Sequence, residues 1–312
     1  MITIKRYTKN DENTWDAFVT TSKNGTFMLK RGYMDYHSDR FTDHSLIFYE
    51  DDIPIALLPA SQHGNELRSH GGLTYGGVIC SFDMKQHTMN DCLEALTTYM
   101  RNNAIEKLLY KPLPYIYHRY PCQEDLYALW RNGAKLVRRD VSSTIEYIDN
   151  PIKLPKGRKS QISRAKREGV TVEISTDFEA FIELENQVLA QYHGLKAVHT
   201  GQELELLHSR FPQEILLYVA KHDGKIEAGA VLFVYANMVH TQYMAGSEYS
   251  RKNGALDLLL ATLIDKFSKE KKFFDFGIST EDEGNILNIG LTAQKEGFGG
   301  RSVVYDFYEL KV

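Results

Sequence analysis

The chain has 312 residues, of which 43% are hydrophobic and 12% are aromatic. This supplies enough apolar side chain for two ordinary cores, so we expect two domains of about 150 residues each. Lysine and arginine number 37 against 41 aspartate and glutamate, which gives a net charge of -4. Such a balance excludes the basic footprint of a dedicated nucleic-acid-binding protein, and DNA is not an expected partner.

The N-terminal residues contain no apolar run typical of a signal peptide, and no later stretch reaches the roughly 18 apolar residues that span a bilayer. We therefore expect a cytoplasmic protein without a transmembrane segment, while peripheral contact with a membrane stays open. Cys80, Cys92 and Cys122 are odd in number and lack a CxxC spacing. The cysteines thus argue against a disulfide framework and a zinc site, and no metal is expected.

The second half of the chain predicts the clearer element order. A basic helix is expected over 157–168, ended by Gly169, and Asp177 and Thr200 are expected to begin two further helices as N-cap residues. Three strands then form a meander, followed by a helix, a buried strand, a helix and a final strand. After the basic helix, the expected ranges are strands 170–174, 214–222, 225–235, 238–246, 273–277 and 302–312 and helices 177–193, 200–210, 254–270 and 284–296.

The first half gives a similar order less distinctly. The expected strands are 2–7, 44–50, 53–62, a glycine-broken strand over 67–79, 106–111 and 134–148. The expected helices are 13–22, 87–103 and 124–133, and residues 33–41 could supply a further helical turn. The halves resemble each other in topology rather than in residues, so we expect a structural duplication. Prolines after Asn150 break the strand there. The predicted domains are therefore residues 1–150 and 151–312.

Three antiparallel strands that lead into a helix and then another strand resemble the GNAT arrangement. The fold class expected is α+β with a mixed sheet, in two tandem GNAT-like (acyl-CoA N-acyltransferase) domains. The resemblance implies that the fourth and fifth strands part to admit a thioester donor, acetyl-CoA or another acyl-CoA. It also implies a pyrophosphate-binding turn at the start of the next helix, where free backbone N–H groups bind anions.

The turn in question offers glycines and cations, and the expected donor-binding residues are Gly246, Ser247, Arg251, Lys252, Asn253 and Gly254. Leu256 stands where the acetyl-CoA signature has a small residue. An ordinary turn into a helix therefore stays an alternative.

Four stretches resemble the FemAB family: 157–172, 243–247, 273–277 and 294–300. Their order and spacing together carry the resemblance, which implies an acyltransferase. Members of the family extend peptidoglycan peptides with aminoacyl-tRNA, and related proteins are acetyltransferases near glycan or envelope pathways. The chain has no stretch resembling the helical arm of some members, so charged tRNA is the less favoured donor but stays open as a partner.

Acyl transfer to an amine needs a base, donors for a developing oxyanion, and a proton for the leaving group. The resemblance matches Lys295 to a lysine near the phosphate or reacting carbonyl; complementing a helix dipole is the alternative. The candidate bases are Glu248, His240, Tyr243 and Asp275. Asp275 lies between two phenylalanines and needs a partner or a raised pKa. A structural hydrogen-bonding role for Asp275 or His240 stays open.

Cations and aromatic residues in both halves suggest an acceptor site. In the basic helix they would hold a diphosphate or an RNA backbone, or form a solvated face. In the first half, glycines flank an aromatic residue and prolines stiffen a loop rich in rings. We expect a small-molecule or precursor acceptor to be bound by Tyr36, His37, Arg40, His70, Tyr75, Lys111, Tyr117, Arg158 and Arg164. Packing between the domains is the alternative for the first-half residues.

Competing chemistries lack their motifs. The His70-Gly71-Gly72 segment has no G-x-S-x-G partner, and the chain has no GxxxxGK, strand-linked GxGxxG or HExxH. The function expected is N-acyl transfer, with acetyl as the first choice, from a thioester to an amine of a cell-envelope or glycan precursor. Aminoacyl transfer from aminoacyl-tRNA to a peptidoglycan precursor and a non-catalytic, precursor-binding module are the alternatives.

Overall fold

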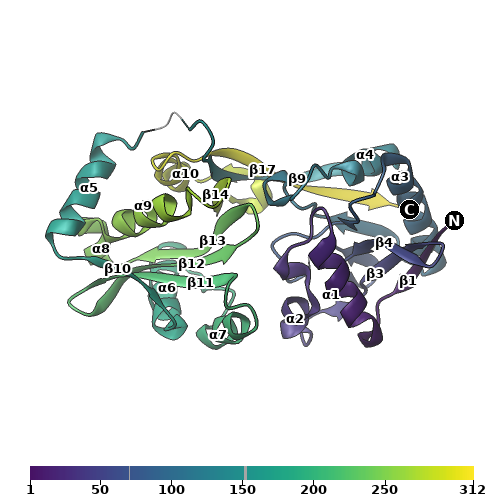
Figure 1. The fold of residues 1–312 in the computed structure, drawn as a ribbon, viewed down its shortest axis with the longest axis horizontal. Coiled ribbons are helices and arrows are strands. Elements are labelled where there is room, and N and C mark those ends of the chain that lie inside the picture. The colour runs from purple at the N-terminus through teal and green to yellow at the C-terminus, as the bar shows by residue number, and fades with distance from the viewer. Residues whose placement is uncertain (70, 151–152) are drawn as a thin grey trace. The chain divides into compact units, whose positions relative to one another are not determined.

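The computed structural model describes residues 1–69, 71–150 and 153–312. They divide into two units (Figure 1). Unit 1 comprises Met1–Asp140, Asp282–Gly284 and Val304–Val312, and unit 2 comprises Val141–Glu281 and Asn285–Val303. Two residues used in the predictions, His70 and the boundary proline Pro151, lie outside the described residues. The expected class, a mixture of helices with a mixed sheet, is confirmed.

Unit 2 is built on a mixed sheet. Its strands lie in the order β10 (Thr171–Ser175), β11 (Ile215–His222), β12 (Lys225–Val234), β13 (Met238–Gly246), β14 (Phe273–Ile278) and the second part of β9 (Lys135–Glu146). The first four strands pair antiparallel, β14 runs parallel to β13, and β9 runs antiparallel to β14. The predicted meander and the strand that follows it are therefore confirmed.

Helices cover both faces of this sheet (Figure 1). On one face lie α6 (Phe178–His193) and α7 (Gly201–Arg210), and on the other lies α9 (Ala255–Phe267), with α5 (Lys156–Arg167) packed against it. The alternation of side chains along β12 explains the two layers. Ala230 and Leu232 share a core with the leucines of α9, whereas a Cβ on Gly229 would lie 2.3 Å from the Phe181 ring of α6.

The two predicted N-caps of unit 2 are confirmed. The Asp177 carboxylate accepts a hydrogen bond from the Ala180 amide at 3.0 Å, and the Thr200 hydroxyl accepts one from the Glu203 amide at 3.1 Å. Each bond satisfies an N–H group that the first helical turn leaves without a partner. Local sequence therefore specifies where α6 and α7 begin.

The predicted helix over 284–296 is wrong in its first part. A hairpin of β15 (Thr280–Glu281) and β16 (Ile286–Leu287) comes first, and α10 spans only Ile289–Glu296. Glu283 and Gly284 have φ of 52° and 90°, which a right-handed helix does not allow. The helix begins after Asn288, whose side chain accepts a hydrogen bond from the Leu291 amide at 2.9 Å.

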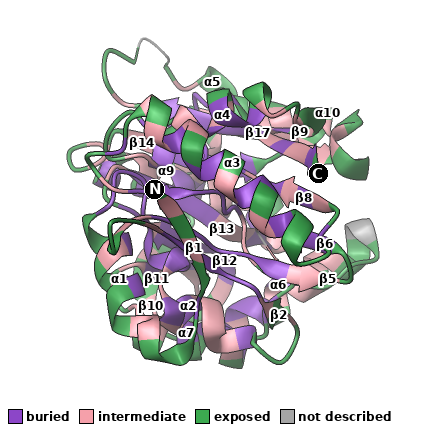
Figure 2. Cartoon of the chain, turned by 90° about the vertical axis from the view of Figure 1, so that its right-hand side faces the viewer, coloured by how far each residue is buried: buried purple, intermediate pink, exposed green. Residues whose placement is uncertain are grey.

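The described strands of unit 1 form a four-stranded sheet and one run of an 11-stranded sheet. One has the order β1 (Ile2–Arg6), β3 (Leu46–Glu50), β4 (Ile53–Leu58) and β7 (Ile79–Cys80); the other has the order β17 (Arg301–Lys311), β8 (Lys107–Tyr110), β6 (Glu66–Arg68), β5 (Ser61–His63) and β2 (Thr42–Asp43). The helices are α1 (Glu12–Thr21), α2 (Arg31–Met34), α3 (Gln86–Asn102) and α4 (Glu124–Arg131). Buried and exposed residues alternate along α3 (Figure 2), whose buried face shares one apolar core with residues of β3 and β4.

The predicted third strand over 67–79, which its glycines were expected to break, forms only at its two ends. The chain pairs only in β6 and β7, and the described residues between them form turns and loops. Gly72 and Gly77 have φ of 72° and 82°, a left-handed conformation that strands do not use. A Cβ on Gly77 would lie 2.9 Å from the Tyr110 hydroxyl, which accepts a hydrogen bond from the Val78 amide at 2.7 Å. The glycines thus permit a close approach rather than a strand.

The two units divide at a different place from the predicted domains. The division falls between Asp140 and Val141, inside β9, and the last strand β17 leads from unit 2 into unit 1. The boundary near Asn150 stays a prediction. The end of β9 belongs to unit 2, where Thr144 lies opposite Asp275 of β14.

Three observations bear on the other expectations. None of the helices in the described ranges is long and apolar enough to cross a bilayer. Within the same residues, histidine, cysteine, aspartate and glutamate form no group of three or more that is placed to hold a metal ion. Cys80, Cys92 and Cys122 are unpaired and buried.

Candidate functional site

Strands β13 and β14 run side by side only at their beginnings. Their pairing starts at Met238 and Phe273 and ends at His240 and Asp275. Beyond this point β13 continues along β12, whereas the register between β14 and β9 shifts after Asp275. The two strands therefore part, as the GNAT resemblance led us to expect.

A cavity of about 740 Å³ lies where the strands part. It is lined by the later residues of β13, the end of β14, and residues of α5, α6, α9, α10 and the short helix α8 (Glu248–Asn253), all within unit 2. A cavity of this size accommodates a small organic ligand. Five predicted site residues line it: Arg158, Tyr243, Gly246, Arg251 and Lys295.

Lys295 reaches this cavity from α10 with a side chain that is only 2% exposed. Its Nζ donates hydrogen bonds to the carbonyl oxygens of Gly277 at 2.8 Å and Ile278 at 2.7 Å. Because a lysine ammonium has three N–H groups, one has no partner among the described residues. Burial lowers the pKa of Lys295 to about 8, against the opposing effect of the charge on Asp275. The side chain is thus a fixed donor at the cavity wall.

Asp275 is fully buried at the end of the β13–β14 pairing. Its carboxylate accepts hydrogen bonds from Ser142 Oγ at 2.5 Å and Thr144 Oγ1 at 2.7 Å, and lies 2.7 Å from His240 Nδ1. Burial raises the pKa of Asp275, but the hydrogen bond and charge of His240 and the two hydroxyl hydrogen bonds outweigh it and hold the pKa below its usual value. These contacts favour the structural alternative for Asp275 and His240.

The Tyr243 hydroxyl points into contacts that keep it neutral. It lies 2.7 Å from His199 Nδ1 and accepts a hydrogen bond from the His199 amide at 3.2 Å. Burial raises the pKa of Tyr243 to about 12. At neutral pH, Tyr243 therefore offers the cavity a neutral hydroxyl rather than a base.

The predicted donor-binding turn contains the one-and-a-half-turn helix α8. Ser247 begins it by accepting a hydrogen bond from the Ser250 amide at 3.1 Å, and its hydroxyl also contacts Glu227. Glu248 is exposed. The cavity lining contains Gly246 and Arg251, but not Glu248 or the other predicted donor-binding residues, Ser247, Lys252, Asn253 and Gly254. Their role in donor binding stays a prediction.

The basic helix α5 covers the start of α9. Arg164 donates a hydrogen bond to the Lys252 carbonyl at 2.8 Å, and Gly254 lies against the carbonyl of Gln161. Arg158 is held by an ion pair with Asp257. Both cations thus interact with other residues of unit 2. Of these two predicted acceptor residues, Arg158 lines the cavity and Arg164 does not.

We expect Gly254→Ala to lower the free energy of unfolding by about 2–4 kcal/mol. Its φ of 79° costs an alanine about 1–2 kcal/mol, and the added Cβ would lie 2.5 Å from the Gln161 carbonyl oxygen, so that α5 must shift. Gly224→Ala is the matched control, because Gly224 has φ of 78° and open space around the added Cβ. Urea unfolding followed by circular dichroism measures both; equal losses would contradict the close approach of α5 and α9.

The sequence predictions missed Glu185 of α6. The residues Phe178, Phe181, Ile182 and Leu189 share its helix face at helical spacing, so a carboxylate within this apolar stripe was the available signal. The Glu185 side chain is 7% exposed and lines the cavity. Burial raises the pKa of Glu185 to about 7. It is therefore a titratable carboxylate inside the site.

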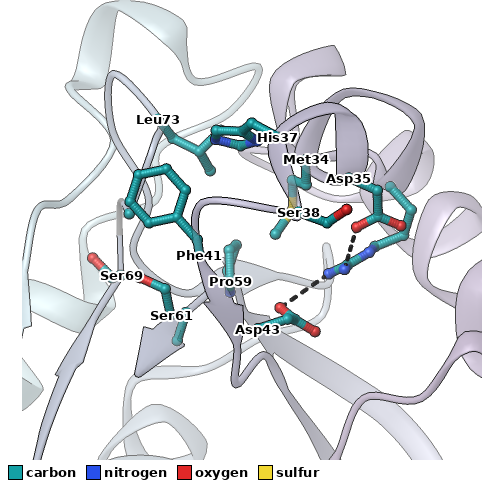
Figure 3. A pocket seen from close by; sticks show the side chains of 13 residues that line it. Met34, Asp35, His37, Ser38, Phe41, Asp43, Pro59, Ser61, Ser69 and Leu73 are labelled. Carbon is teal, nitrogen blue, oxygen red and sulfur yellow. Dashed lines mark hydrogen bonds and ion pairs between the residues drawn. The ribbon is translucent and has the colours of Figure 1, made fainter. Parts of the chain in front are cut away.

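A smaller pocket lies in unit 1, between α2 and β5 (Figure 3). It measures about 40 Å³, room for little more than a water molecule. Arg31 forms ion pairs with Asp35 and Asp43 at its wall. His37, a predicted acceptor residue, lines it with Nε2 3.1 Å from the Gly72 carbonyl oxygen. No nucleotide-activated sugar fits in this pocket.

Two predicted acceptor residues are part of the interior of unit 1. Tyr75 and Tyr117 are buried, with ring centroids 4.6 Å apart. The Tyr117 hydroxyl lies 3.0 Å from that of Tyr305. These contacts favour packing over ligand binding for both tyrosines.

The other predicted residues of unit 1 are nearer its surface. The Lys111 ammonium lies 4.6 Å from the centroid of the Phe307 ring, and burial lowers the pKa of Lys111 to about 8. Tyr36 stacks on His37 with centroids 4.3 Å apart, and Arg40 is exposed. Whether these side chains bind an acceptor stays a prediction.

Comparisons with known proteins agree with this architecture. Residues 156–283 match the family model described as "Acetyltransferase (GNAT) domain". No curated protein matches the chain. The structure is similar to that of FemX, with a TM-score of 0.69 and 13% identity over 99% of this chain and 97% of FemX.

Two further structures are similar over nearly the whole chain. A C-terminal domain from Agrobacterium fabrum, described as that of a lysylphosphatidylglycerol synthetase, has a TM-score of 0.62 and 13% identity over 97% of this chain and 92% of its own. A tandem GNAT protein from the clavulanic acid biosynthesis pathway has a TM-score of 0.57 and 10% identity over 100% and 98%. At these identities the likeness shows the fold, two tandem GNAT domains.

Proposed function

Because residues 156–283 match a GNAT acetyltransferase family model and the chain has the fold of FemX, we propose that it is an acyltransferase that transfers an acyl group to an amine in the unit 2 cavity. The observation that carries the proposal is the end of the β13–β14 pairing at His240 and Asp275, with Lys295 at the wall of the cavity beyond it. The parted strands give a donor room to place its carbonyl beside a fixed cation.

The reaction needs charge stabilisation at one oxygen. When the amine attacks the donor carbonyl, a C–N bond forms and negative charge develops on the carbonyl oxygen. Lys295 lines the cavity and holds two of its N–H groups on backbone carbonyls, which leaves the third without a partner among the described residues. We assign it the role of donor to that oxygen.

The donor we favour is a thioester, acetyl-CoA or another acyl-CoA, since the GNAT fold generally uses acyl-CoA. The acceptor we favour is an amine of a cell-envelope or glycan precursor, which places the reaction in the cytoplasm. Aminoacyl-tRNA is the second candidate donor. The first observation that supports it is the likeness to FemX and to the lysylphosphatidylglycerol synthetase domain. The second is the packing of α5 against Gly254, since this glycine lies at the turn where a GNAT domain binds pyrophosphate.

A donor panel tests this proposal. The purified chain is incubated with acetyl-CoA or with charged tRNA, each in the presence of amino-sugar nucleotides, peptidoglycan-peptide amines or aminolipids. We expect amine-dependent release of free thiol from acetyl-CoA; amine-dependent loss of the aminoacyl group from tRNA would assign the second donor.

The same panel can also contradict the proposed transferase activity. A precursor that raises the melting temperature, while neither donor is consumed, would favour a non-catalytic binding module over a transferase.

A further inference from the structure

Three polar atoms of residues that line the unit 2 cavity have no hydrogen-bond partner among the described residues. They are Oε2 of Glu185, Oγ1 of Thr241 and Oε1 of Gln242. The residues come from α6 and β13, which pack against each other. Buried polar atoms without partners are costly. Three such atoms in residues of one cavity lining therefore indicate a ligand that supplies hydrogen-bond donors.

A β-bulge lies at two of these residues. The register between β12 and β13 shifts so that Val231 lies opposite Tyr243 and Leu232 opposite Thr241, which leaves Gln242 as the extra residue. In a regular strand, neighbouring side chains point to opposite faces, and a bulge re-aims one of them. Thr241 and Gln242 accordingly both line the cavity.

The chemistry of this wall selects the ligand group. All three atoms accept hydrogen bonds, and one belongs to a carboxylate. A primary ammonium has three N–H donors, a positive charge and no acceptor, whereas a hydroxyl supplies a single donor and an anion is repelled by the carboxylate. We propose that Glu185, Thr241 and Gln242 bind the acceptor's primary amine as its ammonium ion, and that Glu185 removes the proton that the amine must lose. This inference rests on the proposed acyltransferase function.

The proposed reaction includes two proton transfers. A proton passes from the ammonium nitrogen to Oε2 of Glu185, and the freed lone pair attacks the donor carbonyl carbon. The C–N bond forms, the bond from that carbon to the donor's sulfur or ester oxygen breaks, and the leaving atom takes the second proton from nitrogen. Glu185 then returns its proton to water. A base acts best when its pKa is near the working pH, and burial brings the pKa of Glu185 to about 7.

The titratable groups near Glu185 decide whether its protonation can be followed in a pH profile. From β13, the Tyr243 hydroxyl stays neutral because its pKa is about 12, and His199, which precedes α7, contacts that hydroxyl. Burial is the cause of the shift of the Glu185 pKa. The other charged residues that line the cavity are Arg158 and Asp257, which are paired with each other, Arg251 and Lys295.

Glu185→Gln tests the base. We expect kcat/KM for a primary alkylamine acceptor to fall about 10²–10⁴-fold, and the rise in log kcat/KM up to pH about 7 to disappear. For an aromatic amine, which is already unprotonated at neutral pH, the loss should stay below about tenfold. Glu183→Gln is the matched control, since Glu183 is exposed on the same helix, and should stay within about twofold of the unmodified chain.

A binding measurement separates this inference from the proposed function. Propylammonium chloride should raise the melting temperature of the unmodified chain above that in equal sodium chloride, propanol should not, and Glu185→Gln should abolish the shift. Transfer to alkylamines that is unchanged in Glu185→Gln would overturn the inference and leave the proposed function standing. Glu185-dependent propylammonium binding without transfer from any donor would do the reverse. No propylammonium binding at all would also overturn the inference.

Discussion

Asp275→Ala is expected to lower the free energy of unfolding by about 3–5 kcal/mol, as removal of one partner from a buried charged network does. The Asp275 carboxylate accepts from Ser142, Thr144 and the Gly277 amide and contacts His240, all of them buried. Alanine would remove the acceptor that these groups share. The midpoint of urea unfolding, followed by circular dichroism, measures the loss.

Asp275→Asn and pH identify the cause. Because the folded pKa of Asp275 lies below its usual value, the ionised carboxylate contributes stability that is present above pH about 4 and is lost as pH falls through the folded pKa. The difference between the unmodified chain and Asp275→Asn should thus be constant from pH about 5 to 8 and shrink in acid. Asp265→Ala, on the exposed side of α9, should cost less than about 0.5 kcal/mol. A difference that grows in acid would contradict this role.

The fold of unit 2 could be predicted because its local signals agree. Apolar runs mark β11 and β12, and side-chain caps mark where α6 and α7 begin. The prediction failed where a residue other than glycine adopts a left-handed backbone, at Glu283 before α10. An apolar pattern indicates which residues are buried. It does not indicate that a residue other than glycine, such as Glu283, adopts a positive φ.

The site was predictable where its residues are close in sequence to a family pattern. The resemblance led to Lys295 and Tyr243, and both line the cavity. It did not lead to Ser142, because this residue is 133 positions from Asp275 and meets it only through the pairing of β9 with β14. It also missed Glu185, because an acidic residue in an amphipathic helix is ordinarily assigned to the exposed face. Long-range pairing and burial are properties of the folded chain.

Lys295→Met is expected to lower kcat for acyl transfer by about 10²–10³-fold with little change in KM, as removal of one donor to a transition-state oxyanion does. The carbonyls of Gly277 and Ile278 fix the Lys295 ammonium. Methionine has a similar volume, but it lacks the positive charge and the third N–H group of the ammonium. Steady-state kinetics with the donor and acceptor found in the panel measure the effect. Lys269→Met, at an exposed lysine outside the cavity, is the matched control.

The pH profile decides between the two roles that a lysine with this pKa can take. Burial brings the pKa of Lys295 to about 8, so a role as the protonated donor requires activity to fall as pH rises through about 8. A role as base would require activity to rise over the same range. With Glu185 accounting for the rise near pH 7, the profile should be a narrow bell between about 7 and 8. Lys295→Met should remove its alkaline limb and Glu185→Gln its acid limb, because each limb reports the ionisation of a different side chain in the same cavity.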